Sequence, residues 1–168
     1  MDKDIQPLMA EFGAAVHDAQ VLEGSIELIL SLLDQTARPS EKVPGVDALI
    51  EYSQKPLGQL IKLLKRRITI VKSDEKLLKD ALDIRNHLVH LFFRREDRLM
   101  ATLTPDGIAA LADEIRDIRA LIKEANNISD RILDELLRKY DLSVDKLKAH
   151  AMEMYRKANL LYLRRVVH

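Results

Sequence analysis

The feature that most constrains the fold of this chain is a run of apolar residues at helical spacing between Ser73 and Asp97. Because successive residues of a helix are about 100° apart, such a run forms one stripe along the helix. The stripe is made up of Leu77, Leu78, Ala81, Ile84, Leu88, Leu91 and Phe92. Ser73 can cap the first turn, and the two acids that follow it suit the positive end of the helix dipole. The pattern predicts one amphipathic helix over 73–97.

A charged residue, Arg85, points into the middle of this stripe. A guanidinium cannot lose its charge and is costly to bury without a partner. Either an acid meets Arg85, or the stripe is more than a core-facing surface. Asp18 and Glu11 lie on the apolar face of the helix expected over residues 4–34, so they are the natural partners if the two helices pack together. We therefore expect a supporting ion pair from Arg85 to one of these acids.

The remaining apolar residues also recur at helical spacing, with loops between them. We expect helices over residues 4–34, 46–52, 57–68 and 104–140, and a last helix that begins at Ser143. Residues 37–45, which contain two prolines and a glycine, should form a loop, and residues 98–105 an extended connector. In the long helix, Ile108, Ile115 and Ile122 recur every seven residues, which favours near-parallel packing of helices in a bundle.

The composition agrees with this pattern. Gly, Pro and aromatic residues are scarce among the 168 residues, while Leu, Ile, Ala, Lys and Glu dominate, as is usual in all-helical proteins. There is no internal repeat and no sign of a second domain. We therefore predict an all-α fold with a single domain over residues 1–168. It should be an antiparallel bundle of about four long helices with one or two short extra helices.

The composition also limits where the protein acts and what it binds. The chain has no cysteine, which excludes disulfides and thiolate metal sites and is compatible with a reducing cytoplasm. The N-terminus lacks the apolar region of a signal peptide, and the longest apolar run, residues 26–33, is too short to span a bilayer. We therefore expect a cytoplasmic protein without membrane contact. Since the formal net charge is zero, any nucleic acid must be bound by local patches rather than by bulk charge.

Two local patches of positive charge stand out in the sequence. Lys65, Arg66 and Arg67 end one of the shorter expected helices, and Arg94 and Arg95 follow the apolar stripe. Both groups lie near the negative end of a helix dipole, where cations are favoured with their charged heads in water. Alternatively, both groups face RNA and bind its phosphates. The sequence leaves the two interpretations open.

Polar residues gather in one helical segment, RNHLVH, from Arg85 to His90. Asn86 and His90 are four residues apart and share a ridge, whereas Arg85 and His90 lie roughly 140° apart around the helix axis. Only a long arginine side chain or a second copy of the helix could bring both to one phosphate. His87 and His90 are spaced to suit a metal, but no spacing elsewhere supplies further ligands. We therefore expect neither a metal nor a cofactor.

This order of residues, arginine then asparagine and, after three more, histidine within one helix, resembles the signature motif of the HEPN superfamily. The resemblance covers the motif and the general plan of a helical bundle. It implies a small all-helical domain that acts as a metal-independent ribonuclease, as many members do, with its site in a cleft between two copies of the domain. RNA is then the substrate, and the protein is a homodimer with part of the apolar stripe at the interface.

The resemblance also implies a role for each motif residue. His90 would move the proton as the RNA 2′-hydroxyl attacks the adjacent phosphate, which leaves a cyclic phosphate and a free 5′-hydroxyl. Arg85 would stabilise charge on the phosphate, and Asn86 would orient His90 or the phosphate. The protein would be a toxin or an anti-phage defence effector, with an antitoxin or another regulatory protein as a further partner. One subgroup of toxins is silenced by modification of a tyrosine two residues after the histidine, but that position here is Phe92.

An alternative explains the same residues without catalysis. An ion pair between Arg85 and Asp18 could fix the register of the bundle, with His90 as a surface residue. The protein would then be a catalytically inactive helical module that binds a nucleotide or another protein, as some members of the superfamily are.

Overall fold

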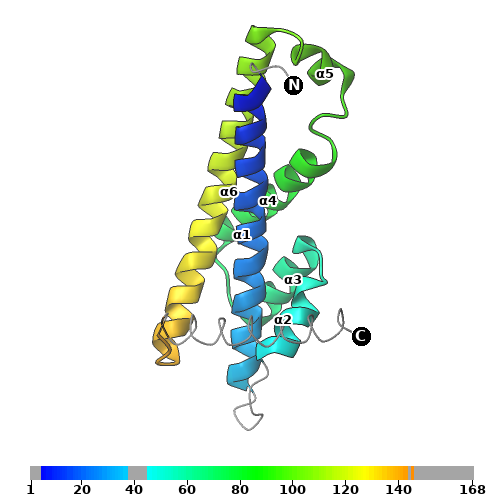
Figure 1. The fold of residues 1–168 in the computed structure, drawn as a ribbon. Helices are drawn as coiled ribbons and strands as arrows, with labels where there is room; N and C mark the ends of the chain where they lie inside the picture. Colours follow the sequence, from blue (N-terminus) through cyan, green and yellow to red (C-terminus); the bar gives the residue numbers. More distant parts are fainter. Residues whose placement is uncertain (1–4, 38–44, 144, 146–168) are drawn as a thin grey trace, which may run out of the picture.

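The computed structural model describes residues 5–37, 45–143 and 145, and the fold of this part is all-α. It contains six helices and no strand (Figure 1). They are α1 Gln6–Ala37, α2 Gly45–Ser53, α3 Leu57–Arg67, α4 Lys72–His90, α5 Glu96–Ala101 and α6 Pro105–Lys139. The all-helical bundle predicted from the sequence is confirmed. None of these helices combines the length and the apolar composition that crossing a bilayer requires.

The two longest helices, α1 and α6, lie side by side along most of their lengths (Figure 1). Both run in the same direction, because the four shorter helices between them return the chain to the end at which α1 begins. The contact buries small residues of α1, Ala15 and Ala19, with Ile115, Ile118 and Ile122 of α6. The seven-residue spacing of the isoleucines thus indicated the packing of α6 correctly.

The third long helix, α4, runs in the opposite direction to α1 and α6 (Figure 1). The antiparallel arrangement predicted for the bundle therefore holds for α4, whereas the pair of α1 and α6 is parallel. At one end of the molecule, Leu88 of α4 joins the core between α1 and α6. At the other end, Leu78 and Ala81 join a second core, which α2 covers with Tyr52 and α3 covers with Leu60 and Leu64.

The boundaries of α4 and its neighbours correct two predictions. The helix expected through Asp97 ends at His90, because Leu91 adopts a non-helical backbone with φ of −127° and Phe92 is buried in the core. The first half of the extended connector expected over 98–105, residues 98–101, belongs to α5, whose first turn holds two acids that suit the helix dipole. The alternation of apolar residues in this stretch was therefore misleading.

Helix starts were predicted with mixed success. Thr104 caps α6 as expected, since its Oγ1 accepts a hydrogen bond from the backbone N–H of Gly107 at 3.2 Å and Pro105 follows it. Ser73 does not cap α4, because the cap position is Val71, without a side-chain hydrogen bond. Apart from Ser143 and residue 145, the last helix predicted from the sequence lies outside the described residues.

Candidate functional site

The motif residues lie in the last two turns of α4. The helix begins with Asp74 and Glu75 in its first turn, an arrangement that the helix dipole favours. Arg85 is half-buried, and both Asn86 and His90 are exposed. The motif is therefore held on a rigid helix with two of its three polar side chains facing solvent.

The Arg85 guanidinium contacts two side-chain oxygen atoms of the same chain. Arg85 Nη2 lies 2.6 Å from Oε1 of Glu23 on α1, and Nη1 donates a hydrogen bond to Oδ1 of Asn86 at 3.2 Å. The exposed fractions of the Arg85 and Glu23 side chains are 24% and 21%, so the pair is largely shielded but open to solvent on one side. An acid does meet Arg85, as the cost of burying an unpaired guanidinium requires.

The identity of this acid corrects the prediction. Asp18 and Glu11 bind Arg119 of α6 instead: Asp18 Oδ2 accepts from Nε at 2.7 Å, and Glu11 Oε2 lies 3.4 Å from Nη1. The hydrogen bond to Asp18 raises the pKa of Arg119. Asp18 and Glu11 face α6, and Glu23 faces α4 because it lies roughly 140° further around α1 than Asp18. The supporting ion pair of Arg85 is therefore with Glu23.

Asn86 and His90 share one face of α4. They are four residues apart, so their side chains leave the helix roughly 40° apart. Arg85 points toward α1, where it meets Glu23. A single copy of the chain therefore links Arg85 to Asn86 by a hydrogen bond and places Asn86 beside His90, but it does not bring Arg85 and His90 to one point.

His87 has a different environment from His90. It is half-buried, and its ring lies edge-on to Phe92 with 6.2 Å between the ring centroids. Phe92 in turn packs against Phe12 and Phe93. His87 is thus part of the aromatic contact at this end of the core, and His90 is the accessible histidine of the motif.

The first group predicted to bind RNA lies at the end of α3. Lys65 pairs with Glu75 of α4, and Arg67 Nη1 lies 2.6 Å from Oδ1 of Asp34 on α1. Arg66 is exposed. Two of these three cations are therefore used within the chain.

The second predicted group follows the end of α4. Arg95 donates two hydrogen bonds to Asp97, at 3.1 and 2.8 Å, which raise the pKa of Arg95 and lower that of Asp97. Arg94 is exposed and lies four residues after His90. The 19 residues of α4, about 28 Å of helix, separate this group from the first. The structure therefore does not gather the five predicted cations into one patch.

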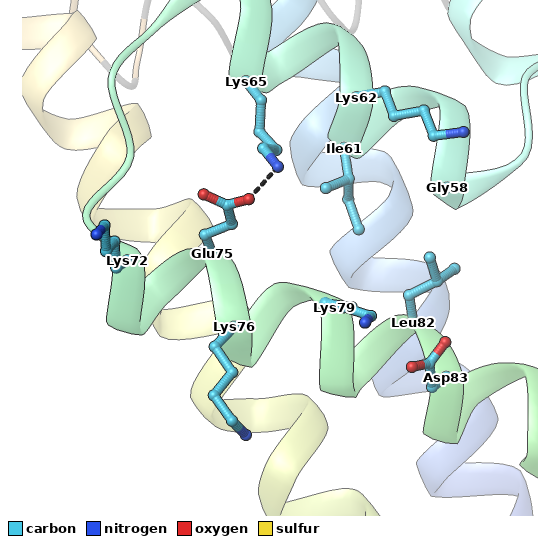
Figure 2. Close-up of a pocket in the computed structure, with 10 residues that line it drawn as sticks. All are labelled: Gly58, Ile61, Lys62, Lys65, Lys72, Glu75, Lys76, Lys79, Leu82 and Asp83. Atoms are coloured by element: carbon cyan, nitrogen blue, oxygen red, sulfur yellow. Dashed lines mark hydrogen bonds and ion pairs between the residues drawn. The ribbon is translucent and has the colours of Figure 1, made fainter.

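A concave site between α3 and α4, which was not predicted, has a volume of about 600 Å³ (Figure 2). Gly58, Ile61 and Leu82 are the small and apolar residues of its lining. Its positive residues are Lys62, Lys65, Lys72, Lys76 and Lys79. The last three recur at a spacing of four and three residues, which puts them on one helix face and was the available signal in the sequence.

Among the described residues, no three histidine or acidic side chains are grouped in a way that could hold a metal ion. No protein-family model, curated protein or solved structure matches the chain. The chemistry available at the end of α4 is therefore that of an accessible imidazole, an amide beside it and a guanidinium held by a carboxylate.

Proposed function

We propose that this chain is a metal-independent RNA endonuclease of the HEPN type, with a composite active site between two copies of the chain. The observation that carries the proposal is the arrangement at the end of α4. There the Arg85 guanidinium donates to Asn86, and His90 is exposed on the same face as Asn86. The resemblance of RNHLVH to the HEPN motif supports the same assignment.

The proposed reaction is a transesterification within the RNA strand. The 2′-hydroxyl gives its proton to His90 and attacks the adjacent phosphorus, and the bond from phosphorus to the 5′-oxygen breaks. The protonated His90 then gives this proton to the leaving 5′-oxygen, so the products end in a 2′,3′-cyclic phosphate and a 5′-hydroxyl. An imidazole suits this proton transfer because it titrates near neutral pH. Arg85 stabilises the negative charge that develops on the phosphate oxygens.

Two copies are needed because Arg85 and His90 diverge by roughly 140° on one helix. A twofold axis near the ends of two α4 helices would set the Arg85 of one copy opposite the His90 of the other. Val89 and Leu91, on either side of His90, are 42% and 49% exposed and offer apolar surface for this interface.

In the proposed reaction, a substrate phosphate replaces Glu23 as the partner of Arg85. Glu23 competes with a phosphate for the guanidinium, while the hydrogen bond from Arg85 to Asn86 uses only one of its five N–H groups. The open side of the pair gives a phosphate oxygen access to the remaining donors. Because the phosphate takes the place of Glu23, Arg85 would have an anionic partner both before and after the substrate binds.

We propose the role of a toxin or an anti-phage defence effector that cleaves RNA in the cytoplasm. The further partner that we propose is an antitoxin or another regulatory protein. Phe92 has no hydroxyl that a partner could modify, and it is 1% exposed. A regulator would therefore act by covering the end of α4 rather than by modifying this position.

The proposal is tested by incubating the purified protein with mixed RNA in excess EDTA. We expect cleavage that survives chelation and yields cyclic-phosphate ends. His90→Ala should lower the rate at least about 100-fold, the usual contribution of a general acid or base. His17→Ala is the matched control, because the His17 side chain is 73% exposed on α1 and should leave the rate unchanged. Equal cleavage by wild type and His90→Ala would contradict the proposal.

The homodimer is tested separately by sedimentation at micromolar concentration without RNA. We expect a dimer, and we expect charged substitutions at Val89 and Leu91 to produce monomers that no longer cleave RNA. A wild-type monomer that cleaves RNA would contradict the composite site.

One observation favours a second candidate function, a catalytically inactive helical module that binds a nucleotide or a protein. The pairing of Arg85 with Glu23 inside one chain is what a purely structural arginine would show. This candidate predicts no RNA cleavage under any condition of the EDTA experiment, and unchanged ligand binding in His90→Ala.

A further inference from the structure

The concave site between α3 and α4, the α3–α4 groove, is narrowed at both ends (Figure 2). Ile61 and Leu82 point into the space between the two helices. At one end the helices approach closely, since a Cβ at Gly58 would lie 3.3 Å from Leu82 Cδ2. At the other end the ion pair of Lys65 and Glu75 bridges the helices. The groove is therefore a short apolar recess with a charged rim.

The rim of the α3–α4 groove carries uncompensated positive charge. Lys65 pairs with Glu75, and Lys76 pairs with Asp80 just outside the lining. Three further lysines of the lining have no acidic partner in the part of the chain that the structure describes: Lys62, Lys72 and Lys79. The remaining acid of the lining, Asp83, is exposed beside Leu82. A ligand of this groove should combine negative charge with an apolar part.

The lysines of α4 lie on the same face of the helix as the motif. Six residues of α4 fall within roughly 40° of one line along the helix, and all are exposed. This face is made up of Lys72, Lys76, Lys79, Asp83, Asn86 and His90. At about 1.5 Å per residue, Lys79 lies roughly 16 Å from His90 along the axis. A chain of phosphates that binds the groove lysines can therefore continue along α4 to the candidate catalytic residue.

We propose that the α3–α4 groove anchors a single strand of RNA. One nucleotide enters the groove with its base against Ile61 and Leu82 and its flanking phosphates against the lysines. The strand then continues along α4, so that a phosphate several nucleotides away reaches Asn86 and His90. This proposal rests on the proposed function, and it adds a substrate-binding site that lies outside the motif.

Three features favour a single strand of RNA over other anionic ligands. A base can enter an apolar recess only when it is unpaired and unstacked, which excludes a regular duplex. Lysine binds phosphate as a point charge and contacts the backbone whatever the base. The distance to His90 suits a strand that occupies at least about four nucleotides, the lower end of the site sizes of single-strand binding proteins.

Binding is measured in the His90→Ala background, which keeps the RNA intact, with a labelled single-stranded oligonucleotide. The combined substitution Lys62→Gln, Lys72→Gln and Lys79→Gln should weaken binding at least about tenfold and reduce the salt slope by about 2, since each phosphate contact contributes about 0.7 for a single strand. The matched control neutralises three lysines elsewhere: Lys55, Lys123 and Lys139. It should change affinity less than about twofold.

A substitution at Asp83 should change RNA affinity in the direction opposite to the triple lysine variant. Its carboxylate lies on the same face of α4 between the lysines and the motif, where it repels a passing phosphate. Asp83→Asn should therefore tighten binding a few-fold. Loss of affinity in Asp83→Asn, or no change in the triple lysine variant, would overturn the proposal. A glutamate-rich peptide that competes better than RNA for the groove would overturn it as well, because the ligand would then be an acidic protein segment.

Cleavage kinetics separate a failure of the groove from a failure of the proposed function. With His90 restored, the triple lysine variant should raise KM for a long RNA and leave kcat unchanged. It should also leave cleavage of a dinucleotide unchanged, because a dinucleotide cannot span from the motif to the groove. Cleavage without dependence on the lysines refutes the anchor alone. Lysine-dependent RNA binding without any cleavage refutes the nuclease and retains the groove as an RNA site.

Discussion

Arg85 of α4 and Glu23 of α1 form an ion pair with 2.6 Å between Nη2 and Oε1, and only 24% and 21% of the two side chains are exposed. Removal of one partner from so shielded a pair leaves the other charge largely desolvated. Glu23 therefore stabilises the position of Arg85. It also occupies the guanidinium that the proposed reaction requires.

Glu23→Gln should therefore change stability and RNA binding in opposite directions. We expect the free energy of unfolding to fall by about 1–2 kcal/mol, between the values for exposed and buried pairs. We expect tighter RNA binding in the His90→Ala background, because a competing carboxylate is gone. Urea unfolding and fluorescence anisotropy measure the two effects. A double-mutant cycle with Arg85→Met isolates the coupling, and a coupling of zero would show that the pair contributes nothing to the fold.

The two histidines of the motif should separate stability from activity. His87 packs edge-on against Phe92, so His87→Ala should lower the free energy of unfolding by about 1 kcal/mol and leave the cleavage rate within a few-fold. His90 is exposed, so His90→Ala should change stability by less than about 0.5 kcal/mol while it removes cleavage. Thermal unfolding measures the stability of the two variants, and initial rates measure their RNA cleavage. The reverse result would assign the proton transfer to His87.

The start of α6 and the partner of Arg85 show how far the sequence could predict this fold. The cap at Thr104 needs only the residues beside it, so local chemistry predicted it correctly. The need for an acid beside Arg85 follows from the cost of burying charge, and it was also correct. Which acid meets Arg85 depends on which side of α1 each neighbouring helix covers. That choice is made by tertiary packing, so Asp18 or Glu11 was predicted where Glu23 is found.

The α3–α4 groove is harder to predict from one sequence than the cap at Thr104 or the acid beside Arg85. Lys62 and Lys79 belong to different helices, and they line one recess only because α3 and α4 diverge from their close approach at Gly58. Short patterns can also mislead. The alternation of Leu99, Ala101 and Leu103 is typical of a strand, although three alternating residues cannot outweigh the helix-favouring acids before them.

Gly107 should be intolerant of any side chain. A Cβ at this position in the first turn of α6 would lie 2.2 Å from the carbonyl oxygen of Ala101, a backbone atom that cannot move without shifting α5. Gly107→Ala should therefore lower the free energy of unfolding by about 1–3 kcal/mol. The matched control is Gly24→Ala on α1, where a Cβ would meet nothing within 4 Å. The control should stabilise the protein by up to about 1 kcal/mol, because alanine favours helix. Equal effects at both positions in urea unfolding would contradict the close approach.

Glu27, one turn after Glu23 on α1, should destabilise the protein at neutral pH. Burial, and then repulsion by Glu23, raise its pKa above 4.5, so the folded state disfavours the ionised carboxylate. The stability of the wild type should therefore fall as the pH rises from 4.5 through the raised pKa. Glu27→Gln removes this fall, so its stabilisation should be present at about pH 7 and absent at about pH 4. Urea unfolding at the two pH values measures the difference, which should stay below about 1 kcal/mol because solvent screens the group. An equal effect of Glu27→Gln at about pH 4 and about pH 7 would contradict the raised pKa of Glu27.

Tyr52 should make the protein sensitive to alkali. Its hydroxyl donates to Asp34, which also pairs with Arg67, and burial followed by this hydrogen bond raises the pKa of Tyr52 to about 12. The unfolded chain releases the phenolic proton near pH 10.0, the ordinary pKa of tyrosine, so the free energy of unfolding should fall between pH 10.0 and about 12. Tyr52→Phe should cost about 1–2 kcal/mol at neutral pH through the lost hydrogen bond, and its stability should decline less steeply in alkali. Urea unfolding at about pH 9 and about pH 11 measures the two slopes. Parallel slopes for wild type and Tyr52→Phe would show that the hydroxyl ionises equally in both states.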